Sequence, residues 1–323
     1  EPIIMRLILI ILTSFLFLYS ISITTAQTRY WVGDSGDWSD TSHWSTTSGG
    51  TGGAAIPTAT DNVIFDANSF SAAGSITSTV KGECHDIDMD NLNVDVSLSF
   101  SNAAFADRRL EINGSAIFSS YLTMNNRMVF QSNDPNENIQ SNGFVHGSLM
   151  EFDNTIAEYT LIDNFAGLSL IMWDGSLTTQ NHDLNFTGID LRNGTSMDAG
   201  SSNIYVKSTF YLNSGSTFSQ NNAHLYLSNL NATANLNSHT IHFIEFTLNG
   251  RILGSNAMID SLIANQGYTN TNTNAHIKYL SIGSNLDWFA SAQVDSIFFL
   301  NAGINWRMGN AVTMTINDTL DLP

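Results

Sequence analysis

The chain has 323 residues, of which 42% are hydrophobic and 11% aromatic, while only 12% are charged. This composition excludes a disordered tail, because there is enough apolar surface to form a core. Lys and Arg total 11 against 29 Asp and Glu, a formal net charge of −18, so nucleic acid would be repelled and no nucleic-acid partner is expected.

An export signal is predicted at the start of the chain. Arg6 follows the first methionine, residues 7–23 are mostly apolar, and the small residues 24–26 form a cleavage site before Gln27. Ser and Thr interrupt the apolar stretch, and it is shorter than the roughly 20 residues that a spanning helix needs. We therefore expect residues 1–26 to be removed, leaving a secreted or bacterial cell-surface protein without a membrane span.

Residues 27–75 form an aromatic and glycine-rich segment that contains Trp31, Trp38 and Trp44. One interpretation is structural: the rings pack over the first repeat and cap it, as the ends of repeat proteins require. The alternative is ligand binding, because flat rings beside Asp and Asn suit the faces of sugars. We favour the cap, and the alternative predicts exposed rings.

Two groups of aspartates are candidates for chemistry. Asp34, Asp37 and Asp40 recur every three residues in a Gly/Ser loop and resemble a calcium site, but the regular oxygen pattern and closing Glu are missing. Calcium is the one cofactor that the sequence suggests.

The second group is Asp86, Asp88 and Asp90, which period two places on one face of a strand. Such an array suits calcium or the acid and base of a polysaccharide hydrolase. A solvated strand face is the interpretation we favour, because catalysis needs groups from several strands to converge. The only cysteine, Cys84, excludes an internal disulfide and is expected to be buried.

The rest of the chain has the patterns of β-strands. In residues 91–101 apolar and polar residues alternate without interruption, which predicts a half-buried strand. Leucines followed by asparagine-rich turns then recur about every 20 residues, at Leu191, Leu212, Leu230, Leu248 and Leu300. A period near 20 indicates a solenoid whose repeats bury their apolar faces by stacking. We predict an all-β fold, with a right-handed parallel β-helix over residues 76–323 and the leucines in one inner column.

The aromatic segment resembles a module of large, repeat-rich secreted surface proteins of gliding, type IX-secreting bacteria. The resemblance covers about residues 29–90 and is carried by the segments Tyr30–Gly33, Gly36–Ser39, His43–Ser45 and Pro57–Asp66, with Cys84–Met89 as the strand that follows. It implies that the module starts a long β-solenoid, and that the full proteins often end in adhesion-type repeats and a sorting domain. The chain stops at Pro323 inside a strand-like segment, so we expect it to be truncated there.

Together these observations favour an exported, adhesin-like structural protein without catalysis. Two alternatives stay open: a polysaccharide-degrading β-helix, either a lyase or a glycoside hydrolase, and a carbohydrate-binding module. Extracellular polysaccharides or cell-surface components are the expected partners in each case.

Overall fold

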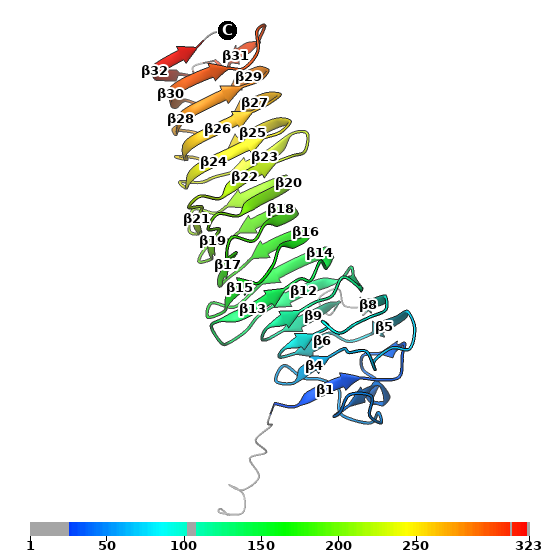
Figure 1. Cartoon of the computed structure of the whole chain (residues 1–323). Helices are drawn as coiled ribbons and strands as arrows, with labels where there is room; N and C mark the ends of the chain where they lie inside the picture. The colour runs from blue at the N-terminus through cyan, green and yellow to red at the C-terminus, as the bar shows by residue number, and fades with distance from the viewer. Residues whose placement is uncertain (1–25, 102–107, 311, 322–323) are drawn as a thin grey trace, which may run out of the picture.

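The computed structural model describes residues 26–101, 108–310 and 312–321, and Figure 1 shows them as one elongated stack of strands. The predicted export signal lies in residues 1–26, nearly all of them outside the described residues. The described part contains strands β1 to β32 and one short 3-10 turn, η1 (Thr41–His43), but no α-helix. The strands coil into a β-solenoid of about 13 turns, which confirms the predicted parallel stack. Its right-handed coiling stays a prediction.

Three sheets run along the stack. Sheet A contains β3 (Trp44–Ser45), β1 (Thr28–Trp31), β4 (Asn62–Ile64), β7 (Ile87–Asp88), β10 (Ala116–Ile117), β13 (Glu137–Gln140), β15 (Glu158–Leu161), β17 (Ser176–Thr178), β19 (Ser196–Asp198) and β21 (Thr217–Ser219), in that spatial order. Sheet B contains β2 (Gly36–Asp37), β5 (Gly74–Ser78), β8 (Val96–Phe100) and β11 (Leu122–Met124).

The third sheet, sheet C, divides in two past its seventh strand. It starts with β6 (Gly82–Cys84), β9 (Arg109–Ile112), β12 (Arg127–Phe130), β14 (Val145–Phe152), β16 (Phe165–Met172), β18 (Leu184–Leu191) and β20 (Asn203–Leu212). One branch continues with β22 (His224–Leu227), β24 (Thr240–Phe246), β26 (Met258–Ala264), β28 (Ala275–Ile282), β30 (Ala292–Phe299) and β32 (Met314–Asp321). The other contains β23 (Ala232–Asn235), β25 (Asn249–Leu253), β27 (Gly267–Asn270), β29 (Asn285–Trp288) and β31 (Trp306–Met308).

The core is a set of columns in which each side chain packs on its equivalent in the next turn. One column in sheet C runs through Leu110, Met128, Met150, Leu170, Ile189 and Phe210, all at most 1% exposed. A single turn buries too little apolar surface to be stable alone, so each column depends on its neighbours. The core is therefore continuous from one end of the stack to the other.

The asparagine-rich turns form corners of the coil. Seven of the ten non-glycine residues with positive φ among the described residues are asparagines, for example Asn181 at 70° and Asn231 at 60°. Asparagine tolerates the left-handed region better than other side chains, because its short amide bonds to the local backbone. This explains why the turns could be recognised from composition.

The predicted leucine column is only partly right. Leu191 pairs with Leu212 in adjacent turns, and both are fully buried. Leu230 and Leu300 are instead exposed in turns, by 58% and 54%. The turns vary in length, so a spacing near 20 does not keep every leucine in phase with the core.

The strand predicted at residues 91–101 is present but shorter, at β8. Its alternation is as expected, with Val96, Leu98 and Phe100 buried between exposed serines. Leu92 is also buried, but it lies in the turn before the strand.

Candidate functional site

The three tryptophans predicted as a cap or a sugar platform are buried. Trp31 and Trp44 are 0% exposed and Trp38 is 1% exposed, and Trp44 packs edge-on against both other rings at 5.1 and 4.9 Å. The indole N–H of Trp31 donates to the Asp34 carbonyl oxygen and that of Trp44 to the Trp38 carbonyl oxygen, each at 2.7 Å. The rings offer no open face to a sugar, so their geometry is that of a cap.

The Asp34, Asp37 and Asp40 carboxylates each serve a separate turn. Asp37 accepts hydrogen bonds from the backbone and hydroxyl of Ser39, and Asp40 caps η1 by accepting from the Ser42 amide. Asp34 accepts from the Ser71 amide, and this bond lowers the pKa of its carboxyl. The three side chains do not converge into a group that could hold a metal ion.

The period-two face predicted at Asp86, Asp88 and Asp90 is present. Ile87 and Met89 point into the core, Asp86 and Asp88 are half-buried on the outside, and Asp90 is exposed. Asp88 accepts from the Asp90 amide within one turn, and Asp90 accepts from the Asn142 side chain, 52 residues further along the chain. Both carboxylates therefore stabilise the coil. Cys84, next to this strand, is fully buried as predicted, and burial raises the pKa of its thiol.

Asp86 is bonded to a member of a different cluster, which the sequence did not reveal. Its Oδ1 atom lies 3.0 Å from His85 Nδ1 and accepts from the Ser115 amide at 2.8 Å. A ring nitrogen of His85 also lies within 4.8 Å of carboxylate oxygens of both Asp134 and Glu137. We call His85, Asp134 and Glu137 the corner cluster.

The corner cluster joins two turns of the coil. His85 follows β6, whereas Asp134 and Glu137 lie in and after the turn between β12 and β13. Glu137 is only 7% exposed, and its two oxygens accept from the hydroxyls of Ser115 and Ser132 at 2.6 and 2.8 Å. The chain separation of about 50 residues hides this contact from any local pattern.

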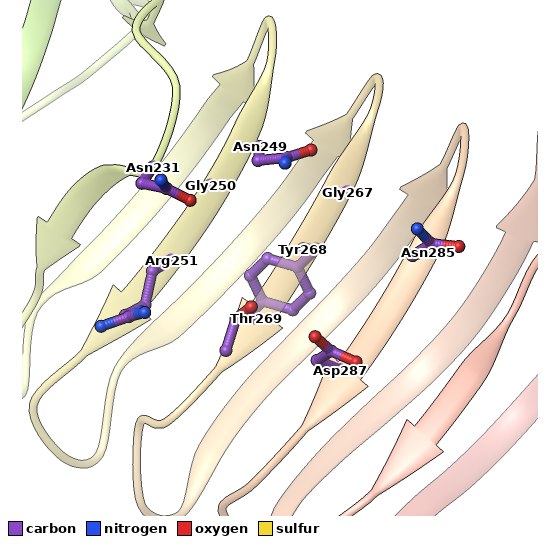
Figure 2. A pocket seen from close by; sticks show the side chains of 9 residues that line it. All are labelled: Asn231, Asn249, Gly250, Arg251, Gly267, Tyr268, Thr269, Asn285 and Asp287. Atoms are coloured by element: carbon purple, nitrogen blue, oxygen red, sulfur yellow. The ribbon is translucent and has the colours of Figure 1, made fainter.

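A polar groove opens on the sheet that contains β25, β27 and β29 (Figure 2). Asn249, Gly267 and Asn285 occupy equivalent positions in successive turns, so the glycine interrupts a column of amides. A Cβ atom at Gly267 would lie 2.9 Å from Asn249 Oδ1. Gly267 lines a cavity of about 260 Å³, which we call the Gly267 groove.

The groove carries charge but no open aromatic face. Arg251 has no hydrogen-bond or ion-pair partner among the described residues. Asp287, in contrast, accepts from Nε and Nη2 of Arg307 at 3.0 and 2.8 Å. Tyr268, at the centre of the view in Figure 2, lines the groove but is only 2% exposed and is part of the core.

A second groove lies beside an exposed aromatic stack, and we call it the Tyr205 groove. Ala166, Asn185, Tyr205 and Tyr226 occupy equivalent positions in four successive turns. The rings of Tyr205 and Tyr226 stack at 5.1 Å with 14° between their planes, and Tyr205 is 39% exposed. Because Ala166 and Asn185 are smaller than the rings, a cavity of about 300 Å³ opens next to Tyr205.

Polar groups in the Tyr205 groove are fixed by hydrogen bonds. Asn164 Oδ1 accepts from the Asp183 amide at 2.8 Å, and Asp183 in turn accepts from the backbone and side chain of Asn203. Asp183 and Asn164 both line the groove. The alternative prediction placed rings beside amide and carboxylate groups at the tryptophans, but the structure brings that combination together here.

Comparisons with known proteins assign no family. No protein-family model matches the chain, and neither a curated protein nor a solved structure matches it. The described residues include no helix with the length and apolarity needed to cross a membrane.

Proposed function

We propose that the chain is an exported, elongated surface protein that acts as an adhesin-like stalk without catalysis. The observation that carries this proposal is the unbroken stack of about 13 turns around one continuous core. Such a stack resists bending, because each turn is bonded to its neighbours along whole strands. A stalk needs length and stiffness more than it needs a reactive site.

The charge and the predicted export signal support the same proposal. A net charge of −18 keeps an elongated protein soluble and limits its association with other acidic surfaces. The resemblance of residues 29–90 to a module of secreted surface proteins of gliding bacteria agrees with a place outside the cell.

The experiment is to incubate the purified chain with a panel of soluble and insoluble polysaccharides. Co-sedimentation and the release of new reducing or unsaturated chain ends are followed together. The stalk proposal predicts no new chain ends with any member of the panel. If the wild type releases chain ends and Asp86→Asn or Glu137→Gln does not, the stalk proposal is wrong and the protein is a polysaccharide-degrading enzyme.

The Tyr205 groove favours a second function, which is binding of a neutral glycan by the stalk. The exposed Tyr205 ring can pack on the apolar face of a sugar, while Asp183, Asn164 and Asn185 offer partners for its hydroxyls. The predicted result is co-sedimentation with at least one neutral polysaccharide, reduced about tenfold or more in Tyr205→Ala.

Two controls make this second test specific. Arg251→Ala alters the Gly267 groove and should leave retention of neutral glycans unchanged. Trp173→Ala removes another exposed ring, 41% exposed, that lies outside the Tyr205 groove. If the wild type and Tyr205→Ala both co-sediment with the glycan to the same extent, the Tyr205 groove is not the binding site. If neither co-sediments with any glycan, glycan binding is excluded and only the stalk proposal remains.

A further inference from the structure

We propose that the corner cluster of His85, Asp134 and Glu137 binds one divalent transition-metal ion, with Zn²⁺ the best match. One ligand atom from each side chain lies within 4.8 Å of the other two. His85 lies two turns before Asp134 and Glu137, and the turn that contains Ser115 lies between them. A shared ion would therefore link turns that do not pair directly. This site is independent of the stalk and of glycan binding.

The orientation of His85 is the first argument. Its Nδ1 atom is 3.0 Å from Asp86 Oδ1, which leaves the Nε2 atom for a metal. Metal-binding histidines usually have their second ring nitrogen bonded to a carboxylate or carbonyl, which fixes the ring and makes it a stronger ligand. Asp86 is therefore a positioning residue rather than a ligand.

Gly114 leaves the space for this pair. A Cβ atom at position 114 would lie 2.3 Å from Asp86 Oδ1 and 2.6 Å from His85 Nδ1. Contacts this short do not occur, so a side chain at position 114 would displace the histidine or the aspartate. The backbone of the neighbouring turn thus fits the oriented His85–Asp86 pair.

The burial of Glu137 is the second argument. The residue is 7% exposed, and its partners among the described residues are the neutral hydroxyls of Ser115 and Ser132 rather than Lys or Arg. A buried carboxylate is costly without a positive charge nearby. Each of its oxygens still has a lone pair free, so a bound cation would supply the charge without breaking either bond.

The turn that carries Asp134 is held near Glu137 before any ion binds. Ser132 Oγ donates to Glu137 and accepts from the Asp134 amide at 3.0 Å, and the Ser132 amide donates to Tyr159 at 3.0 Å. The Asp134 side chain itself is exposed. It can rotate inward to bring its oxygen to the roughly 2.1 Å bonding distance that zinc requires.

The mixture of ligands selects the class of ion. Imidazole suits Zn²⁺ and other transition metals, whereas Ca²⁺ and Mg²⁺ prefer oxygen ligands alone. Three protein ligands leave one position of a tetrahedral zinc site for water. Calcium, which the aspartate runs suggested, should therefore bind here much more weakly than zinc.

The test is isothermal titration of the purified, EDTA-treated chain with ZnCl₂, repeated with CaCl₂. We expect one zinc ion per chain and a thermal midpoint that rises with zinc concentration, because the ion binds only the folded state. His85→Ala should abolish binding. Asp86→Asn should weaken it 10- to 100-fold, as expected for a residue that orients a ligand.

His276→Ala is the matched control. His276 also pairs with a carboxylate, Asp295 at 2.8 Å, but it belongs to no group of three potential ligands among the described residues. The His276→Ala variant should therefore bind zinc as tightly as the wild type does. Asp134→Asn changes only an exposed side chain, so a loss of binding in this variant with unchanged circular dichroism cannot be attributed to misfolding.

Two results would overturn the proposal. One is a wild-type chain that binds no zinc at up to 1 mM, roughly the weakest specific range for a metal site. The other is equal zinc affinity in the wild type, His85→Ala and Asp134→Asn, which would place the ion elsewhere. Cobalt offers an independent readout, since its visible absorption should appear in the wild type and vanish in His85→Ala.

Discussion

The two ends of the stack differ in how their apolar side chains are covered. At the first end, Trp31, Trp38 and Trp44 are at most 1% exposed, and β3 pairs antiparallel with β1. At the last described turn, Trp306, Met308 and Leu320 are 40%, 43% and 42% exposed. The terminal turn of a parallel solenoid cannot cover its own outer edge. Its backbone N–H and C=O groups and its apolar side chains are arranged to contact a further turn.

The comparison shows what a cap must do. The antiparallel strand β3 uses the backbone groups of β1 that would otherwise form an open edge, and the tryptophans fill the volume that a preceding turn would occupy. His43 adds a further layer, stacked on Trp31 at 4.8 Å. Pairs of variants, one at a buried site and one at an exposed site, test this difference.

The largest expected effect is in the cap. Trp44→Ala removes a ring that packs on Trp31, Trp38 and Phe65, and it should lower the free energy of unfolding by about 3–5 kcal/mol. Trp306→Ala, at the exposed end, should cost less than about 1 kcal/mol. Urea denaturation followed by circular dichroism measures both. Equal losses would show that the cap is no more tightly packed than the open end.

The second prediction concerns acid. His146 is 1% exposed, and burial lowers its pKa to about 4, so the folded state holds it neutral while the unfolded state protonates it near pH 6.5. The unfolded chain binds more protons in this pH range than the folded chain does. The free energy of unfolding therefore falls as the pH drops from 6.5 to about 4. The loss is about 3 kcal/mol.

The measurement is the free energy of unfolding at several values of pH for the wild type and His146→Gln. The variant cannot titrate at this position, so its stability should change less between pH 6.5 and 4. A wild-type slope in His146→Gln would assign the acid sensitivity to other groups.

Much of the fold was predictable because stacking imposes local patterns. Alternation at Val96, Leu98 and Phe100 requires one buried face, and the asparagines at left-handed corners follow from backbone sterics. The phase of the leucines was not predictable, since turns of variable length shift Leu230 and Leu300 out of the core.

The candidate sites were largely unpredictable from the sequence. His85 meets Glu137, and Tyr205 meets Tyr226, only through the register between turns. The period-two pattern singled out Asp86, but it gave no indication that Asp86 pairs with His85 or that the His85 ring lies near Asp134 and Glu137, two turns further on. The tryptophans were predicted to form a cap, with a sugar platform as the alternative, and their burial agrees with the cap.

The third prediction compares two asparagines of the later turns. Asn272 is 0% exposed, and its side chain donates to the Leu253 carbonyl oxygen and accepts from the Ala257 amide. Asn272→Ala leaves the Ala257 amide without its partner, while the Leu253 carbonyl oxygen keeps only the Leu236 amide. The substitution should cost about 1–3 kcal/mol. Asn301→Ala removes an exposed amide bonded to the Gly283 carbonyl oxygen, where water can replace it. A cost above 1 kcal/mol for Asn301→Ala would contradict this difference.

The smallest effect is expected at an exposed ion pair near the open end. Arg307 is 67% exposed and bonds to Asp287, so Arg307→Ala should cost less than about 1 kcal/mol, and still less in 1 M salt. Arg127→Ala removes the partner of Glu151, whose side chain is 3% exposed. That variant leaves a buried charge uncompensated and should cost several times more, with little dependence on salt. Denaturation curves at low and high salt separate the two, and equal costs would mean that burial does not set the strength of these pairs.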